Sequence, residues 1–387
     1  MTPRDRVLRL TRRVGSSWIV DAAPRARLVM TDSSFPARHY SAMPDGRLRC
    51  DVCPRECTLS DGQRGLCFVR AREGDRMVLT TYGRSSGFCV DPIEKKPLAH
   101  FFPGSSVLSF GTAGCNLTCK FCQNWDISKA RAMDRLQDEA SPEQIADAAV
   151  RTGARSVAYT YNDPVIFLEY AVDVAHACRA RGLKNVAVTA GYVKPEARAD
   201  FFAPMDAANV DLKAFTEGFY GKLCTAELAP VLDTLRWLVH ESHVWTEITT
   251  LLIPGHNDGD DELRALSRFV ADELSVDVPL HFSAFHPDWR MHDVPATPPA
   301  TLQRARAIAH EAGLRYVYTG NVHDPEGQST RCPSCQARVI GRDGYRITGW
   351  NLEGGRCGAC GTAIAGHFED TPGAWGSRRL QVQLATR

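Results

Sequence analysis

The sequence predicts an α/β fold, an incomplete barrel of six or seven βα units with a four-cysteine segment before it and a second four-cysteine domain after it. Three observations support this prediction. Between residues 105 and 324, short β-branched runs alternate with longer segments of helical periodicity, which is typical of βα units around a parallel sheet. Eleven of the fourteen cysteines fall into three compact groups. The 387 residues can bury one substantial core with smaller appendages.

The βα units can be followed in order along the chain. The expected strands are Val107–Gly111, Ser156–Tyr161, Asn185–Thr189, Asn209–Lys213, Val244–Leu252, Leu280–Phe285 and Arg315–Tyr318. Ser141-Pro142-Glu143 opens a helix, because serine is a good N-cap and proline is favoured in the first turn. The other expected helices are Ile166–Arg181, Leu228–Glu241, Asp260–Leu274 and Thr301–Ala312.

Four regions follow from this pattern. Residues 1–48 form a basic N-terminal arm, 49–104 a four-cysteine segment, 105–324 the barrel, and 325–387 a four-cysteine domain with a tail. We expect little regular structure before residue 105, because this region is polar and rich in proline. The basic residues of the arm are Arg4, Arg6, Arg9, Arg12 and Arg13.

Composition excludes several classes of function. Forty-six basic and forty-five acidic side chains give a net charge of +1, so no general field attracts nucleic acid or anionic lipid. No apolar run is long enough to cross a bilayer or resembles a secretory signal, and we expect a cytoplasmic protein. The cysteine spacing favours metal sites in a reducing compartment over disulfides. Cys89, Cys178 and Cys224 lie outside the groups, and we expect them to be buried small hydrophobes.

The central cysteine group is Cys115, Cys119 and Cys122, a CxxxCxxC directly after the first expected strand. Three thiolates on one short loop suit an iron–sulfur cluster, and three ligands leave one iron of a four-iron cluster open. The open iron can chelate the amino and carboxylate groups of S-adenosylmethionine, whose reductive cleavage gives a 5′-deoxyadenosyl radical. The alternatives are a zinc site completed by a histidine such as His100, or reduced structural cysteines.

The triad, with Phe121 before its last cysteine, resembles the radical SAM superfamily. Other motifs narrow the resemblance to relatives of pyruvate formate-lyase activating enzyme, and most closely to the radical SAM enzyme of the AmmeMemoRadiSam system. These motifs are Cys53-Pro54-Arg55-Glu56-Cys57, Pro92-Ile93-Glu94-Lys95-Lys96-Pro97-Leu98, Tyr161-Asn162-Asp163-Pro164 and Gly320-Asn321-Val322. The resemblance runs from about residue 50 to 366. It implies a partial TIM-like (β/α)6 barrel, a 4Fe-4S cluster and S-adenosylmethionine.

The resemblance also implies an activity and partners. The radical abstracts a hydrogen from an unidentified substrate, and Cys115, Cys119 and Cys122 are the catalytic cluster ligands. The expected partners are a reductant protein such as flavodoxin or ferredoxin and, by family association, Memo-like and AMMECR-like proteins. Neither a membrane nor nucleic acid is expected.

Polar residues at the ends of several strands are the expected cofactor contacts, because reacting ligands gather at the carboxyl mouth of such barrels. They are Asn162, Asp163, Thr189, Gly191, Asp211, Lys213, Glu247, Thr249 and His286. By resemblance, the Asn-Asp pair matches the motif that holds the cofactor's amino group, although relatives commonly have glutamate at position 163 and asparagine at position 190. The alternatives are a plain β-turn before Pro164, a structural salt bridge across the barrel, and a structural histidine.

Two further cysteine groups flank the barrel. Cys332, Cys335, Cys357 and Cys360 form two CxxC knuckles typical of a zinc ribbon, although iron can use the same arrangement. Cys50, Cys53, Cys57 and Cys67 form a looser group that fits zinc or a second iron–sulfur cluster, and the spacing favours zinc.

Two other functions compete with the leading one. A glycyl-radical-enzyme activase would act on a partner protein, but such enzymes with extra clusters usually carry ferredoxin-like cysteine runs after the triad. A non-catalytic zinc protein would bind RNA or a protein partner through its ribbon. The arginines available for that contact are Arg331, Arg338, Arg342, Arg346 and Arg356.

Overall fold

The structure is a computed structural model that describes residues 17–20, 34–130, 136 and 138–384, and the arginines of the basic arm lie outside these ranges. Its centre is a mixed sheet of ten strands in the order β1-β23-β9-β10-β12-β13-β14-β15-β16-β17. Seven consecutive strands are parallel. They are β10 (Ser106–Phe110), β12 (Ser156–Tyr159), β13 (Lys184–Thr189), β14 (Ala207–Asp211), β15 (Trp245–Leu252), β16 (Leu280–Ala284) and β17 (Val317–Gly320).

These seven strands confirm the sequence prediction to within one or two residues at most ends. β9 (Phe88–Pro92) pairs antiparallel with β10, β23 (Leu380–Leu384) pairs antiparallel with β9, and β1 (Ser17–Val20) pairs parallel with β23. No sequence pattern indicated that the tail of the last region returns to the central sheet as β23. Among the described residues no strand pairing joins β17 to the opposite edge, so the closed or partial barrel stays a prediction.

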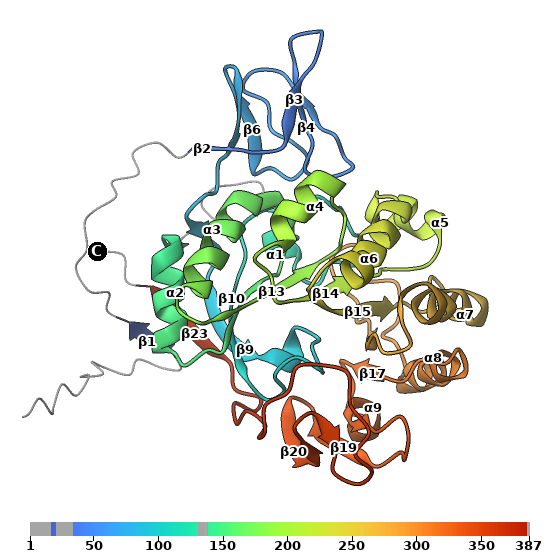
Figure 1. Cartoon of the computed structure of the whole chain (residues 1–387). Helices are drawn as coiled ribbons and strands as arrows, with labels where there is room; N and C mark the ends of the chain where they lie inside the picture. The colour runs from blue at the N-terminus through green and yellow to red at the C-terminus, as the bar shows by residue number, and fades with distance from the viewer. Residues whose placement is uncertain (1–16, 21–33, 131–135, 137, 385–387) are drawn as a thin grey trace, which may run out of the picture.

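The helices run along the outer side of the parallel strands (Figure 1). They are α2 (Pro142–Arg151), α3 (Leu168–Arg179), α4 (Pro195–Phe202), α6 (Ala229–Glu241), α7 (Asp260–Arg268) and α8 (Pro299–Glu311). α2 begins with a capping box, in which the Ser141 side chain accepts from the Gln144 N–H and the Gln144 side chain accepts from the Ser141 N–H. α4 was not predicted. No helix in the described ranges is long and apolar enough to cross a bilayer.

The region before the barrel contains more regular structure than the sequence predicted. Two three-stranded sheets form there, in the orders β3-β4-β5 and β2-β7-β6. Their strands are β2 (Phe35–Pro36), β3 (Tyr40–Ala42), β4 (Leu48–Cys50), β5 (Thr58–Leu59), β6 (Arg70–Glu73) and β7 (Arg76–Leu79). The expectation of little regular structure is wrong, because strands of two to four residues are too short to show an alternating pattern. The boundary expected after residue 48 falls inside β4.

The C-terminal four-cysteine domain is built on β18 (Thr330–Arg331), β19 (Arg338–Asp343) and β20 (Arg346–Trp350), with a second pair β21 (Leu352–Glu353) and β22 (Arg356–Cys357). Its core contains Val339, Ile340 and Leu352, which pack against Tyr318 of β17 and against Tyr316, directly before that strand.

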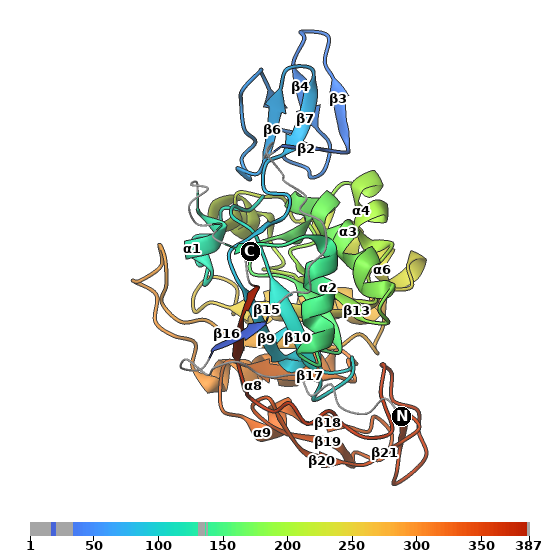
Figure 2. The same ribbon diagram turned by 90° about the vertical axis from the view of Figure 1, so that its left-hand side faces the viewer.

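The two four-cysteine regions lie at opposite ends of the molecule (Figures 1 and 2). The N-terminal region contacts the carboxyl ends of the strands, because the Val52 carbonyl accepts from the N–H of Lys194, which follows β13. The C-terminal domain contacts their amino ends, where Glu369 pairs with Arg155, which directly precedes β12. Loops at the carboxyl ends of parallel strands are where reacting groups gather.

Candidate functional site

The triad loop follows the carboxyl end of β10, and its backbone packs closely against neighbouring backbone at two glycines. A side chain at Gly111 would place its Cβ 2.4 Å from the Thr160 carbonyl oxygen, and one at Gly114 would lie 1.9 Å from the Cys67 carbonyl oxygen. Gly114 also has a φ of +80°, which favours glycine. These two glycines bring the triad loop against both the neighbouring strand and the N-terminal region.

Asn162, at the end of β12, holds this loop in place. Its Oδ1 accepts from the Thr112 N–H at 3.1 Å, and its Nδ2 donates to the Gly114 carbonyl oxygen at 2.8 Å. The side chain is buried and its amide is occupied by loop contacts. Asn162 therefore orients the backbone that precedes Cys115, and its contact with a cofactor stays a prediction.

Asp163 lies beside the triad as a buried carboxylate. Its Oδ1 accepts from Thr189 Oγ1 at 2.8 Å and from the Val165 N–H, and its Oδ2 accepts from the Ala190 N–H. Burial raises the pKa of Asp163 to about 6. Burial, with a smaller effect from Asp163, raises the pKa of the Cys115 thiol to about 12. The acid, Thr189 and the first cysteine of the triad thus lie at one edge of the sheet.

The turn at this edge agrees in part with the alternative interpretation of Asn162 and Asp163. Asp163 caps the 3-10 turn Pro164–Phe167, so it does serve the backbone before Pro164. Gly191 has a φ of +65°, and its N–H donates to Thr189 Oγ1 at 3.1 Å. The predicted residues at the ends of β12 and β13 are therefore brought together through one hydrogen-bonded network around the Asp163 carboxylate.

Asp211 and Lys213 form an ion pair at the end of β14, with 2.5 Å between Lys213 Nζ and Asp211 Oδ2. Burial disfavours the charged form of Lys213, but Asp211 and the Cys119 thiolate outweigh it and raise its pKa above the usual value. The pair lies beside the triad and joins the last residue of β14 to the segment directly after it, so it does not bridge the barrel as a structural salt bridge would. A half-buried cation next to Cys119 can neutralise part of the charge of a thiolate-ligated cluster.

Thr249 is the neighbour of Asp211 in the β14–β15 register. Its side chain is buried, and its Oγ1 has no hydrogen-bond partner among the described residues. A buried hydroxyl without a partner is unusual in a protein interior. Thr249 is therefore a candidate ligand contact.

Cys224 belongs to the site and was missed by the sequence analysis. Its thiol hydrogen-bonds to Cys119, and this bond, acting against burial and aided by Lys213 and Lys129, lowers the pKa of Cys119 to about 6. The carbonyl groups of Leu223 and Cys224 accept from backbone N–H groups of the triad loop. No local motif could have indicated this contact, because Cys224 lies about a hundred residues beyond the triad in the sequence.

The short helix α1 (Trp125–Ser128) and the segment after β16 cover the outer side of the triad. Ser128 Oγ lies 3.0 Å from Cys122 Sγ. The Trp125 ring stacks on Trp289 with centroids 4.9 Å apart, and Trp125 Nε1 donates to Asp288 at 2.9 Å. Trp125 remains 41% exposed. His286, predicted as a cofactor contact, lies exposed in the same segment, and no contact among the described residues joins it to the triad.

Glu247 is placed differently from the sequence prediction. It lies two residues from the start of β15, at the amino end of the sheet, and is fully buried. The backbone N–H groups of Ala99 and His100 donate to it at 2.8 Å, as does Trp245 Nε1 at 3.0 Å, and it pairs with His281 at 2.7 Å. The Glu247 carboxylate joins β15 to the segment that contains Ala99 and His100 and to His281 of β16. Glu247 is therefore a structural residue and not a cofactor contact.

His100 is equally remote from the triad. Its ring bonds to the Ala365 carbonyl and to the Tyr318 hydroxyl, and burial lowers its pKa to about 4. The alternative in which His100 completes a zinc site with the triad is therefore wrong, because His100 joins the central sheet to the C-terminal domain.

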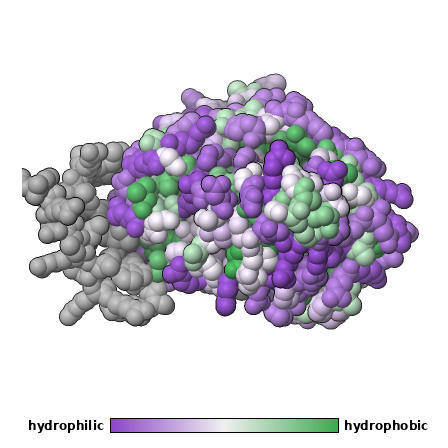
Figure 3. All heavy atoms as spheres, turned by 60° about the horizontal axis from the view of Figure 1, so that its bottom comes forward, coloured by the Kyte–Doolittle hydropathy of each residue, from purple (hydrophilic) through white to green (hydrophobic). Residues whose placement is uncertain are grey.

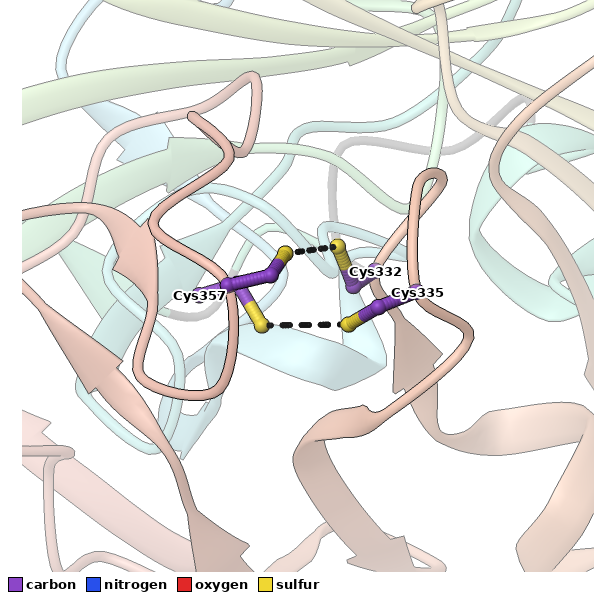
Figure 4. A group of neighbouring side chains, drawn as sticks. Cys332, Cys335 and Cys357 are labelled. Atoms are coloured by element: carbon purple, nitrogen blue, oxygen red, sulfur yellow. Dashed lines mark hydrogen bonds between the residues drawn. The ribbon is translucent and has the colours of Figure 1, made fainter.

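The C-terminal cysteines converge on one point. The Sγ atoms of Cys332 and Cys360 are 3.6 Å apart, and those of Cys335 and Cys357 are 3.7 Å apart (Figure 4). A tetrahedral zinc with Zn–S bonds of about 2.3 Å separates its thiolates by roughly 3.8 Å. Among the described residues, this is the only set of three or more potential ligands whose atoms lie within 4.8 Å of one another. The arrangement fits a zinc ribbon, and the identity of the metal stays a prediction.

The chain is similar to several known proteins. Residues 110–267 match the family model described as the radical SAM superfamily. An uncharacterized protein of Methanocaldococcus jannaschii is 41% identical over 330 residues, covering 85% of this chain and 98% of the relative. Pyruvate formate-lyase 1-activating enzyme of Escherichia coli (strain K12) is 20% identical over 235 residues, covering 56% and 93%. A radical SAM methyltransferase structure from Sphaerobacter thermophilus has a TM-score of 0.45 at 14% identity, covering 74% and 76%.

Proposed function

Because this chain belongs to the radical SAM superfamily, we propose that Cys115, Cys119 and Cys122 hold a 4Fe-4S cluster and that S-adenosylmethionine binds beside it at the carboxyl edge of the sheet. The superfamily implies both an iron–sulfur cluster and S-adenosylmethionine. When bound, they supply a one-electron cleavage to a 5′-deoxyadenosyl radical, which removes a hydrogen from the substrate.

The residues present fit this pair of groups. The three thiols of the triad do not all lie within 4.8 Å of one another, so they lack the close set of ligands that a single zinc ion requires. A half-buried cation, Lys213, lies next to Cys119, where it offsets the negative charge of the thiolates. Thr249 offers a buried hydroxyl without a partner. These features together favour an anionic cluster and a polar ligand at one place.

Each residue of the site has a defined task in this proposal. Asn162 fixes the loop that carries the triad, and Cys224 donates a hydrogen bond to Cys119. We propose that Asp163 accepts a hydrogen bond from the amino group of S-adenosylmethionine, and that Thr189 and Gly191 shape the adjacent backbone. Asp211, Lys213 and Thr249 form the opposite wall, where they can contact the carboxylate or ribose hydroxyls.

The observation that carries the proposal is the convergence of Cys119, Lys213 and Asp163 at one edge of the sheet. It is tested by electron paramagnetic resonance of the reduced protein, prepared without oxygen, before and after addition of S-adenosylmethionine. We expect the cluster signal to change on addition in the wild type and in Cys178→Ala, a control that removes a buried cysteine of α3. Loss of that change in Cys178→Ala, or its persistence in Cys119→Ala, would contradict the assignment.

A second candidate is an activase that removes hydrogen from a glycine of a partner protein. Two observations favour this activase function. The first is that several relatives are named activating enzymes. One of them is choline trimethylamine-lyase activating enzyme of Oleidesulfovibrio alaskensis, which is 28% identical over 102 residues. In addition, the stacked Trp125 and Trp289 are placed beside the triad with Trp125 partly exposed, as a contact for a protein substrate requires. Formation of a glycyl radical on an added partner would separate this function from a small-molecule reaction.

The interpretation as a zinc protein that binds RNA through its ribbon is less well supported. Arg342 is buried and donates to the Ala99 carbonyl, while Arg331 pairs with Glu326 at 2.6 Å. Two of the five arginines are thus committed to the fold. The surface at this end is largely hydrophilic, with apolar residues in small separate groups (Figure 3). We propose a structural zinc ion for this domain, and a flavodoxin- or ferredoxin-type protein as the reductant of the triad cluster.

A further inference from the structure

The four N-terminal cysteines line a single pocket. Cys50, Cys53 and Cys67 are buried and Cys57 is half-buried. The same pocket is lined by Arg70 of β6 and by Asn116, which directly follows the first cysteine of the triad. Four thiols around one pocket form a potential metal site that is enclosed by protein on most sides.

The spacing of these thiols differs from that of the C-terminal group in the same chain. The C-terminal thiols approach to 3.6 and 3.7 Å and lie together within 4.8 Å, as around one tetrahedral ion. Among the described residues no three of the N-terminal thiols meet that limit, although all four face the same pocket. Thiolates on a four-iron cluster are separated by roughly 6 Å, because the cluster stands between them. Neither this group nor the triad has the close set of thiols that a single tetrahedral ion requires, and this difference from the C-terminal group favours a cluster over zinc.

Arg70 supplies an independent indication that the pocket takes an anionic group. Its side chain is only 2% exposed and pairs with Glu169 through both terminal nitrogens, at 2.9 and 3.0 Å. Its Nε has no hydrogen-bond partner among the described residues, and the side chain lines the pocket. A buried guanidinium donor without an acceptor is costly. Thiolate or sulfide sulfur in the pocket would provide that acceptor.

The pocket adjoins the triad directly. The Cys67 carbonyl oxygen packs against Gly114 on one side of Cys115, and Arg55 donates to the carbonyl oxygen of Asn116 on the other side at 2.8 Å. Arg55 also bonds to Thr225, next to Cys224. The C-terminal ribbon, by contrast, lies at the opposite end of the sheet (Figure 2). A redox centre in the N-terminal pocket would have the triad cluster as its neighbour.

We propose that Cys50, Cys53, Cys57 and Cys67 hold a second iron–sulfur cluster that passes electrons to the cluster of the triad. One electron enters the second cluster from the reductant protein and leaves it for the triad cluster, so the second cluster returns to its oxidised state after each transfer. The relay rests on the proposed function, whereas the presence of the cluster does not.

The cluster is tested in the full-length chain with Cys115→Ala, Cys119→Ala and Cys122→Ala combined, isolated without oxygen and analysed for iron, sulfide and zinc. We expect about four iron and four sulfide per chain, about one zinc, and a signal in the reduced protein that S-adenosylmethionine does not alter. Adding Cys53→Ala and Cys67→Ala should remove the iron and keep the zinc. Adding Cys332→Ala and Cys335→Ala instead should remove the zinc and keep the iron.

A triple variant with about two zinc ions and no iron would overturn the second cluster. Because this variant lacks the triad, its metal content is independent of the proposed function. The metal content of the triple variant also remains informative if the further loss of Cys53 and Cys67 prevents folding. The relay is measured as the rate at which reduced flavodoxin reduces the triad cluster in Cys53→Ala/Cys67→Ala. We expect at least a tenfold slower reduction than in the wild type, while dithionite still reduces the triad. Equal rates with flavodoxin would overturn the relay.

Discussion

Glu247 and Thr249 lie two residues apart on β15, on one face of the strand, yet the structure gives them opposite roles. Glu247→Gln should destabilise the protein and leave binding of S-adenosylmethionine unchanged. The carboxylate accepts four hydrogen bonds from buried donors, and the amide nitrogen of glutamine would face at least one N–H group. Hydrogen bonds to a charged group contribute about 1.5–3 kcal/mol each. Loss of two of them gives an expected cost of about 3–6 kcal/mol.

Thr249→Val is the matched control on the same strand. It removes a buried hydroxyl that has no partner in the described ranges, so the stability should stay the same or rise slightly. If this hydroxyl contacts the cofactor, the loss of about 1 kcal/mol weakens binding of S-adenosylmethionine by roughly fivefold. Denaturant unfolding and equilibrium binding of S-adenosylmethionine measure the two effects separately. The reasoning is refuted if Glu247→Gln abolishes binding at full stability, or if Thr249→Val unfolds the chain.

Three further predictions concern the triad and its neighbours. Asn162→Ala should lower the cluster content of the isolated protein, measured as iron and sulfide per chain, because Gly114 loses the amide that holds it; normal content would contradict this role. Since burial raises the pKa of Asp163 to about 6, binding of S-adenosylmethionine should weaken as the pH falls through about 6, and Asp163→Asn should flatten this dependence in a titration of Kd against pH. Cys224→Ala should lower the reduction potential of the triad cluster, because a hydrogen bond to a ligand sulfur favours the reduced state; an unchanged potential in a redox titration would exclude the contact.

The parallel strands were predictable from the sequence because each is a buried, β-branched run between helical segments. Val157 and Val186 are fully buried, as is typical of the apolar runs of parallel strands. The short strands of the N-terminal region gave no such signal. Their core, which includes Val69 and Met77, is formed by pairing between segments of only two to four residues.

The candidate site was predictable where a motif is local and not where contacts are distant in the sequence. The triad, Asp163 and the Asp211–Lys213 pair lie at strand ends, which the alternation of strands and helices locates. Glu247 was misplaced because a period of two fixes the face of a strand but not the end at which a residue lies. Cys224 was missed because its contact with Cys119 joins segments about a hundred residues apart, which no spacing rule describes.

The central claim is that the triad carries the chemistry of S-adenosylmethionine cleavage. The most direct test is formation of 5′-deoxyadenosine by anaerobically prepared protein supplied with S-adenosylmethionine and dithionite. We expect product from the wild type and from Cys178→Ala, and none from Cys119→Ala. Equal product from Cys119→Ala, or none from wild type that is loaded with cluster and binds S-adenosylmethionine, would contradict the account.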